Sequence, residues 1–138
     1  LHGEKVGVGT VLASNEYHRL TACEDVRGHV LPYAQVDLDW LRDYFGEKLW
    51  PAAYSENEHD CLARVTPERL TECWPEMRRI VASIPEGETV RQRLQALGAK
   101  QSLTDLGVPE EKLPELLRIS PLIRNRLTLM RTRRMLDL

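Results

Sequence analysis

The chain has 138 residues, of which 42% are hydrophobic and 29% are charged, and its formal net charge is −2. This length is typical of one domain, and the composition excludes a wholly disordered chain. No apolar run reaches the roughly 20 residues that a membrane span needs, and the small net charge gives no reason to expect a nucleic-acid partner.

Helical spacing dominates the first part of the chain, and no segment alternates as a strand does. A first helix is predicted over about residues 3–23, with one apolar or small face. That face consists of Val6, Thr10, Ala13, Tyr17 and Leu20. After a break at 28–32, Asp37 is expected to cap a short helix that Gly46 ends. Residues 51–60 are polar and predict a surface connection or a marginal helix.

The middle of the chain contains further start and stop signals for helices. Thr66 and Pro67 suit the beginning of a helix that runs toward Ile84, and Pro75 predicts a kink or two separate helices. Gly98 is expected to follow the end of the next helix.

The last third of the chain is predicted to be helical as well. Ser102, with Asp105 three residues later, predicts a capped turn that ends at Gly107. Pro109 is expected to open another helix, and Ser120–Pro121 a last helix that continues to Leu136. Together these signals predict an all-α fold, a bundle of six to eight short helices.

The three cysteines, Cys23, Cys61 and Cys73, are odd in number and lack C-x-x-C spacing, which predicts reduced thiols. The first residues show no signal peptide, so we expect a cytoplasmic protein. Position 1 is Leu rather than Met. We therefore expect the chain to be part of a longer protein.

The first residues of the chain hold the densest motif, Leu1-His2-Gly3-Glu4-Lys5-Val6-Gly7-Val8-Gly9. Each glycine in a helix costs about 1 kcal/mol relative to alanine, which indicates close packing of the helix or the approach of a ligand. His2 stands where the helix would begin, either as a metal ligand or only as its first residue. His18, His29 and His59 do not complete a ligand-spaced cluster with it.

Arginines gather near the other end of the chain. Arg131, Arg133 and Arg134 are expected on an exposed helix face, where positive charge near a helix C-terminus is favourable. Arg124 and Arg126 are candidates for contact with an anion, because guanidinium groups bind phosphate and carboxylate through paired hydrogen bonds. Anchoring of the last helix is the alternative role for these two.

Three segments of the sequence resemble one known family. These are His2–Gly9, the Leu-Gly-Ala and Leu-Gly steps at 97–99 and 106–107, and the stretch Ile123-Arg124-Asn125-Arg126-Leu127-Thr128-Leu129. In this order they resemble the sn-glycerol-1-phosphate dehydrogenases, which belong to the glycerol dehydrogenase, dehydroquinate synthase and iron-containing alcohol dehydrogenase superfamily. The similarity spans nearly the whole chain.

The resemblance implies a dehydroquinate synthase-like two-domain fold. Residues 1–138 would form a single helical domain on the metal and substrate side, and a missing N-terminal α/β domain would bind NAD or NADP. A divalent metal, usually zinc but nickel or iron in some members, would be held by His2 together with an Asp and a His that precede the chain. Gly3, Gly7 and Gly9 would line the cleft between the domains.

The implied reaction is hydride transfer from the nicotinamide to dihydroxyacetone phosphate, which yields sn-glycerol 1-phosphate. The isolated chain would be inactive, and the whole enzyme could be a homo-oligomer. Two alternatives remain open: a glycerol dehydrogenase-like enzyme with a different substrate, and a helical interaction module without catalysis.

Overall fold

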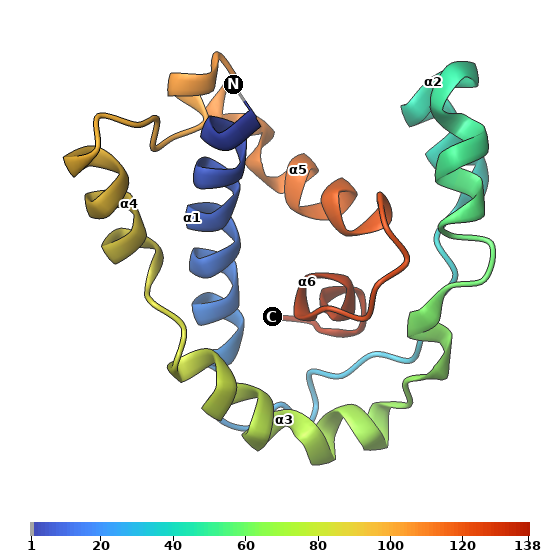
Figure 1. The fold of residues 1–138 in the computed structure, drawn as a ribbon. Coiled ribbons are helices and arrows are strands. Elements are labelled where there is room, and N and C mark those ends of the chain that lie inside the picture. Colours follow the sequence, from blue (N-terminus) through green and yellow to red (C-terminus); the bar gives the residue numbers. More distant parts are fainter. Residues whose placement is uncertain (1) are drawn as a thin grey trace. The chain divides into compact units, whose positions relative to one another are not determined.

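The structure is a computed structural model that describes residues 2–138; Leu1 lies outside the described residues. The described chain contains six α-helices, five short 3₁₀ helices and no strand, so the predicted all-α class is confirmed (Figure 1). The α-helices are α1 (His2–Thr21), α2 (Leu38–Ser55), α3 (Pro67–Ala82), α4 (Gly87–Ala96), α5 (Leu113–Ile119) and α6 (Leu129–Thr132). The 3₁₀ helices are Cys61–Arg64, Thr104–Leu106, Glu110–Lys112, Ser120–Leu122 and Arg133–Met135. One isolated antiparallel bridge joins Val30 and Leu136.

The chain forms two compact units, and each consists of two separate stretches of sequence. The first unit combines the residues up to Asp25 with Cys73–Pro114, and the second combines Val26–Glu72 with Glu115–Leu138. Two of the three boundaries therefore fall inside α3 and α5, and the third follows Asp25. Within residues 2–138, no helix is both long and apolar enough to cross a membrane.

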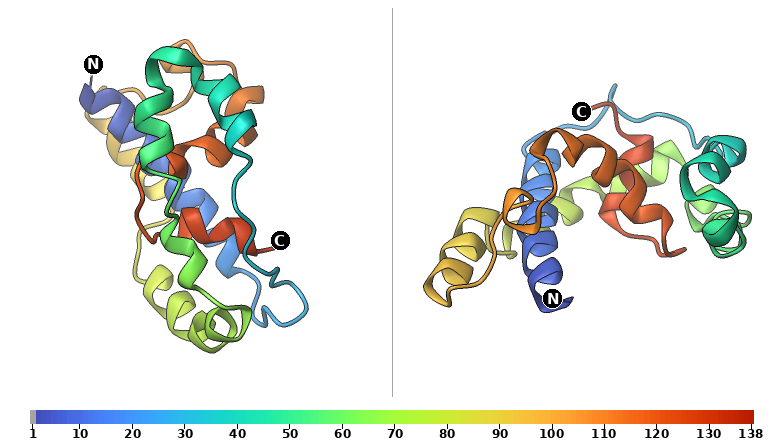
Figure 2. Two further views of the ribbon diagram at one scale, coloured as in Figure 1. Left: turned by 90° about the vertical axis from the view of Figure 1, so that its right-hand side faces the viewer. Right: turned by 90° about the horizontal axis from the view of Figure 1, so that it is seen from above.

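In the first unit, α1 packs along α4 (Figures 1 and 2). Val8, Val11 and Leu20 of α1 are buried, and so are Trp74 and Val81 of α3. Trp74 Nε1 donates to the carbonyl oxygen of Cys23 at 2.9 Å and so satisfies a backbone acceptor just beyond the end of α1.

The second unit has its core around α2. Leu41, Ala53, Ile119 and Leu122 form a buried cluster, against which partly buried residues of α2, including Trp50, pack. The backbone within α2 is non-helical at one residue, Gly46, which has φ 68° and ψ 168°. Two helical stretches therefore meet there, in agreement with the predicted stop.

Most predicted caps are present. Asp37 Oδ1 accepts hydrogen bonds from the amides of Asp39 and Trp40, both at 3.0 Å. Thr66 Oγ1 accepts from the Arg69 amide at 3.2 Å at the start of α3. After α4, Gly98 has φ 67° and its amide donates to the carbonyl of Gln95. The capped turn before Gly107 is also formed, because Ser102 Oγ accepts from the Asp105 amide.

Two predicted helices differ from the structure. The two-helix alternative at Pro75 is wrong, since α3 is one helix. Burial of Trp74 before the proline and of Val81 after it compensates for the hydrogen bond that proline cannot make. The predicted last helix from Ser120 is also wrong. In its place the chain forms the 3₁₀ helix Ser120–Leu122, an irregular segment at 123–128, and then α6. The Thr128 hydroxyl caps α6 by accepting a hydrogen bond from the Arg131 amide at 3.2 Å.

Candidate functional site

His2 is the first residue of α1, and it is exposed. Within residues 2–138, its imidazole has no hydrogen-bond partner, so both ring nitrogens are open to a ligand. A catalytic metal site uses about three protein ligands. No group of three His, Cys, Asp or Glu side chains in the described chain could hold a metal ion. His2 can supply one ligand, and the other donors of such a site would have to come from outside the described residues.

The three glycines that follow His2 have different surroundings. A Cβ atom at Gly7 would lie 3.2 Å from Cδ2 of Leu94, so this glycine allows α1 and α4 to pack closely. At Gly3 and Gly9, a Cβ atom would meet nothing within 4 Å. Close packing within the described chain therefore explains Gly7 and leaves the other two glycines on open helix surface.

The same side of α1 carries a shallow groove of about 310 Å³. Val6, Gly9, Ala13 and Tyr17 line it at steps of three and four residues, which continue the helical row that begins at His2. Val6 is 52% exposed. The predicted apolar and small face is thus present, but it is largely open from Val6 to Tyr17, and Leu20 is its buried member.

The loop between α3 and α4, which the sequence analysis did not identify as important, packs against α1. Ser14 Oγ donates to the carbonyl oxygen of Pro85 at 2.5 Å. At Gly87, which is buried, a Cβ atom would lie 2.8 Å from the backbone oxygen of Val11 and 2.1 Å from Oδ1 of Asn15. Only glycine permits this approach, and the proline at 85 with a glycine two residues later was the signal that could have indicated it.

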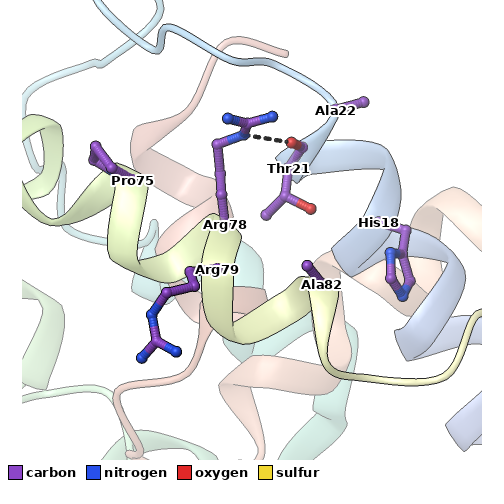
Figure 3. Close-up of a pocket in the computed structure, with 7 residues that line it drawn as sticks. All are labelled: His18, Thr21, Ala22, Pro75, Arg78, Arg79 and Ala82. Carbon is purple, nitrogen blue, oxygen red and sulfur yellow. Dashed lines mark hydrogen bonds between the residues drawn. The ribbon is translucent and has the colours of Figure 1, made fainter.

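A second concave site, of about 450 Å³, lies between the end of α1 and one face of α3 (Figure 3). Its lining residues are His18, Thr21, Ala22, Pro75, Arg78, Arg79 and Ala82, which include two arginines, one histidine and no carboxylate. Arg78 and Arg79 extend in different directions in Figure 3. Arg79 pairs with Glu76 through both carboxylate oxygens, one of them 2.7 Å from Nε.

Arg131, in the second unit, corrects the expectation of an exposed arginine face. Its side chain is fully buried, and its guanidinium makes five hydrogen bonds. Nε donates to Oδ1 of Asp60 at 2.8 Å, and Nη2 donates to Oδ1 of Asn57 at 2.9 Å. Arg134 is 20% exposed and donates to Oδ2 of the same aspartate at 2.5 Å.

This pairing controls the pKa of Asp60. Burial alone would raise the pKa of this carboxyl, but hydrogen bonds from Arg134 and Arg131 and from the Leu62 amide hold it below its usual range. A net charge of +1 therefore remains in the cluster of one carboxylate and two guanidinium groups. The arrangement fixes α6 in the second unit and has no open face for a ligand at Arg131.

Arg124 and Arg126, the two arginines expected to contact an anion, lie on either side of Asn125, whose side chain is held by two hydrogen bonds. Asn125 donates through Nδ2 to the His59 carbonyl at 2.7 Å and accepts through Oδ1 from the Cys61 amide at 2.9 Å. Arg124 is exposed, with Nη1 3.5 Å from Oε1 of Glu56, and Arg126 is exposed. Anion contact by these two side chains stays a prediction.

Within residues 2–138, His29, His59 and the three cysteines belong to no group that could hold a metal ion. His29 Nδ1 lies 3.1 Å from the carbonyl oxygen of Asp137, in the second unit. Cys23, Cys61 and Cys73 are free and partly buried.

Comparison of the chain with protein families, curated proteins and solved structures finds no match. The function is therefore argued below from the residues and their geometry.

Proposed function

We propose that residues 1–138 are the C-terminal helical domain of a metal-dependent, NAD(P)-linked oxidoreductase that reduces dihydroxyacetone phosphate to sn-glycerol 1-phosphate. The motif His2–Gly9 and its resemblance to that family motivate the proposal. The single observation that carries it is the exposed start of α1, where an imidazole without a partner lies next to glycines that no part of the described chain covers.

In this proposal the free imidazole of His2 holds one position on a divalent metal, and a preceding domain supplies an Asp and a second His. A metal bound there would supply Lewis-acid stabilisation of negative charge on the oxygen at C2 of the ketone, and the nicotinamide would supply the hydride. Zinc is the metal proposed, with nickel or iron as its substitutes. The isolated chain lacks the other donors and the nucleotide site, so it is proposed to be inactive.

The exposed glycines support this arrangement on energetic grounds. Gly3 and Gly9 each cost about 1 kcal/mol relative to alanine in a helix, and nothing in the described chain requires them. Glycine is suited to a helix that another backbone or a ligand approaches closely. The proposal gives both positions that role, at the cleft between the helical domain and the missing nucleotide-binding domain.

The test is an assay of the full-length protein, in which oxidation of NADH or NADPH is followed with dihydroxyacetone phosphate as substrate. We expect turnover by the wild-type protein, and a loss of at least 100-fold together with a loss of bound metal in His2→Ala. His59→Ala is the matched control, because this histidine is exposed and its only hydrogen bond involves its backbone oxygen.

Three results would contradict the proposal or one of its parts. Full metal content and normal turnover in His2→Ala would remove the assigned ligand. Turnover with glycerol but not with the phosphorylated ketone would favour the glycerol dehydrogenase-like alternative. A full-length protein with neither activity and no bound metal would favour the non-catalytic helical module.

A further inference from the structure

The site between α1 and α3 in Figure 3 lies far from the proposed metal ligand. His2 and His18 belong to the same helix and are sixteen residues apart, which corresponds to about 24 Å at 1.5 Å per residue. Whatever binds near His18 therefore cannot share atoms with a small ligand at His2. The inference below rests on this local geometry and not on the proposed function.

Arg78 is the principal cation of this site. Its Nε donates to the carbonyl oxygen of Thr21 at 2.9 Å, at the last residue of α1. This hydrogen bond satisfies one of the free carbonyls of the helix end and fixes the guanidinium. In the part of the chain that the structure describes, the two terminal nitrogens of Arg78 have no partner, so this pair of donors remains available.

The sequence around Arg78 explains why its charge is not compensated. Arg19, Arg79 and Arg91 each pair with a glutamate three residues before them in the same helix. The corresponding position for Arg78 is Pro75, and the other neighbours at helical spacing are Trp74, Val81 and Ala82. No carboxylate is therefore within reach on α3, and none lines the pocket.

His18 adds a second polar group. Its Nε2 lies 3.0 Å from the carbonyl oxygen of Ile84, which can only accept, so this nitrogen carries the hydrogen. Among residues 2–138, Nδ1 has no partner. Ala22, Pro75 and Ala82 supply the apolar part of the lining. A fixed guanidinium, an imidazole and an apolar wall are the elements of a site for a small organic anion.

We propose that the pocket between α1 and α3 binds the oxyanion group, phosphate or carboxylate, of a small metabolite through the terminal nitrogens of Arg78. The C-terminal end of α1 carries partial negative charge, which disfavours an anion, and the hydrogen bond from Arg78 to Thr21 offsets part of that charge. The volume of about 450 Å³ is larger than one phosphate ion needs and within the range of small-ligand sites.

The experiment is calorimetric titration of the full-length protein with inorganic phosphate, and in parallel with acetate, at low ionic strength. Arg78→Gln is expected to weaken binding at least ten-fold, and Arg93→Gln, which changes the charge equally at an exposed position of α4, is expected to leave it unchanged. Tighter phosphate than acetate binding would identify a phosphorylated ligand, and the reverse would identify a carboxylate.

A second pair of variants keeps the test valid if Arg78→Gln loosens the end of α1. Ala82→Asp places a carboxylate in the pocket wall without removing any hydrogen bond, and Ala96→Asp makes the same change at the last residue of α4. We expect at least a ten-fold loss of affinity in Ala82→Asp alone. Equal affinity in the wild-type protein and Ala82→Asp, or equal losses in both aspartate variants, would overturn the proposal.

Discussion

Arg131 directs all three guanidinium nitrogens to acceptors inside the second unit, and several of these are backbone carbonyls that no other side chain reaches. The backbone carbonyl oxygens of Pro121 and Arg124 accept hydrogen bonds from Nη1 of Arg131 at 2.6 and 3.1 Å. The backbone carbonyl oxygen of Glu56 accepts from Nη2 at 3.3 Å. Pro121 lies in the 3₁₀ helix Ser120–Leu122, Arg124 lies in the irregular segment after it, and Glu56 directly follows α2. The arginine therefore satisfies backbone acceptors of three neighbouring segments.

Replacement of Arg131 by methionine should destabilise the protein by about 3 kcal/mol, because it leaves a buried carboxylate and several buried carbonyls without this donor. Urea unfolding followed by circular dichroism measures the change. Arg126→Met is the control; its side chain is exposed, and a change within about 0.5 kcal/mol is expected. Equal stabilities of the two variants would contradict the structural role of Arg131.

The carboxyl of Asp60 gives a dependence of stability on pH. Its pKa is below the ordinary value of 3.8 in the folded chain, so the unfolded chain binds its proton first as the pH falls. The stabilisation is complete at neutral pH and is lost as the pH falls below 3.8 toward the folded pKa. Asp60→Asn should flatten the acid limb of a curve of unfolding free energy against pH; an unchanged limb would contradict the assignment.

The burial of Arg131 and its pairing with Asp60 could not be predicted from the sequence. The arginines near the C-terminus form a charged run, and a charged run usually lies on a solvated face. Asp60 lies 71 residues before Arg131, and local spacing contains no signal for that pairing. His2 was different, because its position at the start of a helix followed from local periodicity, and α1 begins at that residue.

At the scale of elements, the glycines of the first unit should respond to alanine with opposite signs. Gly87→Ala forces a Cβ atom against the backbone oxygen of Val11, so a loss of about 1–3 kcal/mol is expected. Gly9→Ala meets no neighbour and should stabilise α1 by up to about 1 kcal/mol. Thermal unfolding measures both changes, and destabilisation by Gly9→Ala would contradict the open surface at this position.

Gly9→Ala also tests the proposed function, since stability and activity should change in opposite directions. The variant should be more stable than the wild-type protein and yet turn over more slowly, because a methyl group enters the proposed cleft. Normal turnover would remove Gly9 from that cleft.

Helix boundaries were predictable where one residue determines them. Asp37, Thr66 and Gly98 act through their own side chains or backbone angles, and each does so where the sequence places it. The helix expected after Ser120 fails for a tertiary reason. Asn125 bonds to the backbone of His59 and Cys61, and these contacts hold the segment outside a helix. Periodicity alone contains no information about such distant partners.

At the scale of the whole molecule, two compact units share one chain of 138 residues. Amide hydrogen exchange should show that the two units open independently. Gly87→Ala should increase exchange mainly at buried amides of α1 and α4, and Arg131→Met mainly at those of α2 and α6. Mass spectrometry of the exchanged protein resolves these regions, and an equal increase in both units from either variant would show that they open together.

The order of the two units along the chain has a consequence for synthesis. The first unit has all its residues once Pro114 has been made, but the second still lacks Glu115–Leu138. Asp60 leaves the ribosome 71 residues before Arg131, an interval of roughly 4 to 14 s at 5–20 residues per second. Until then its carboxylate must stay hydrated rather than buried. The nascent protein should therefore complete its first unit early and close its second only after residue 131 has emerged.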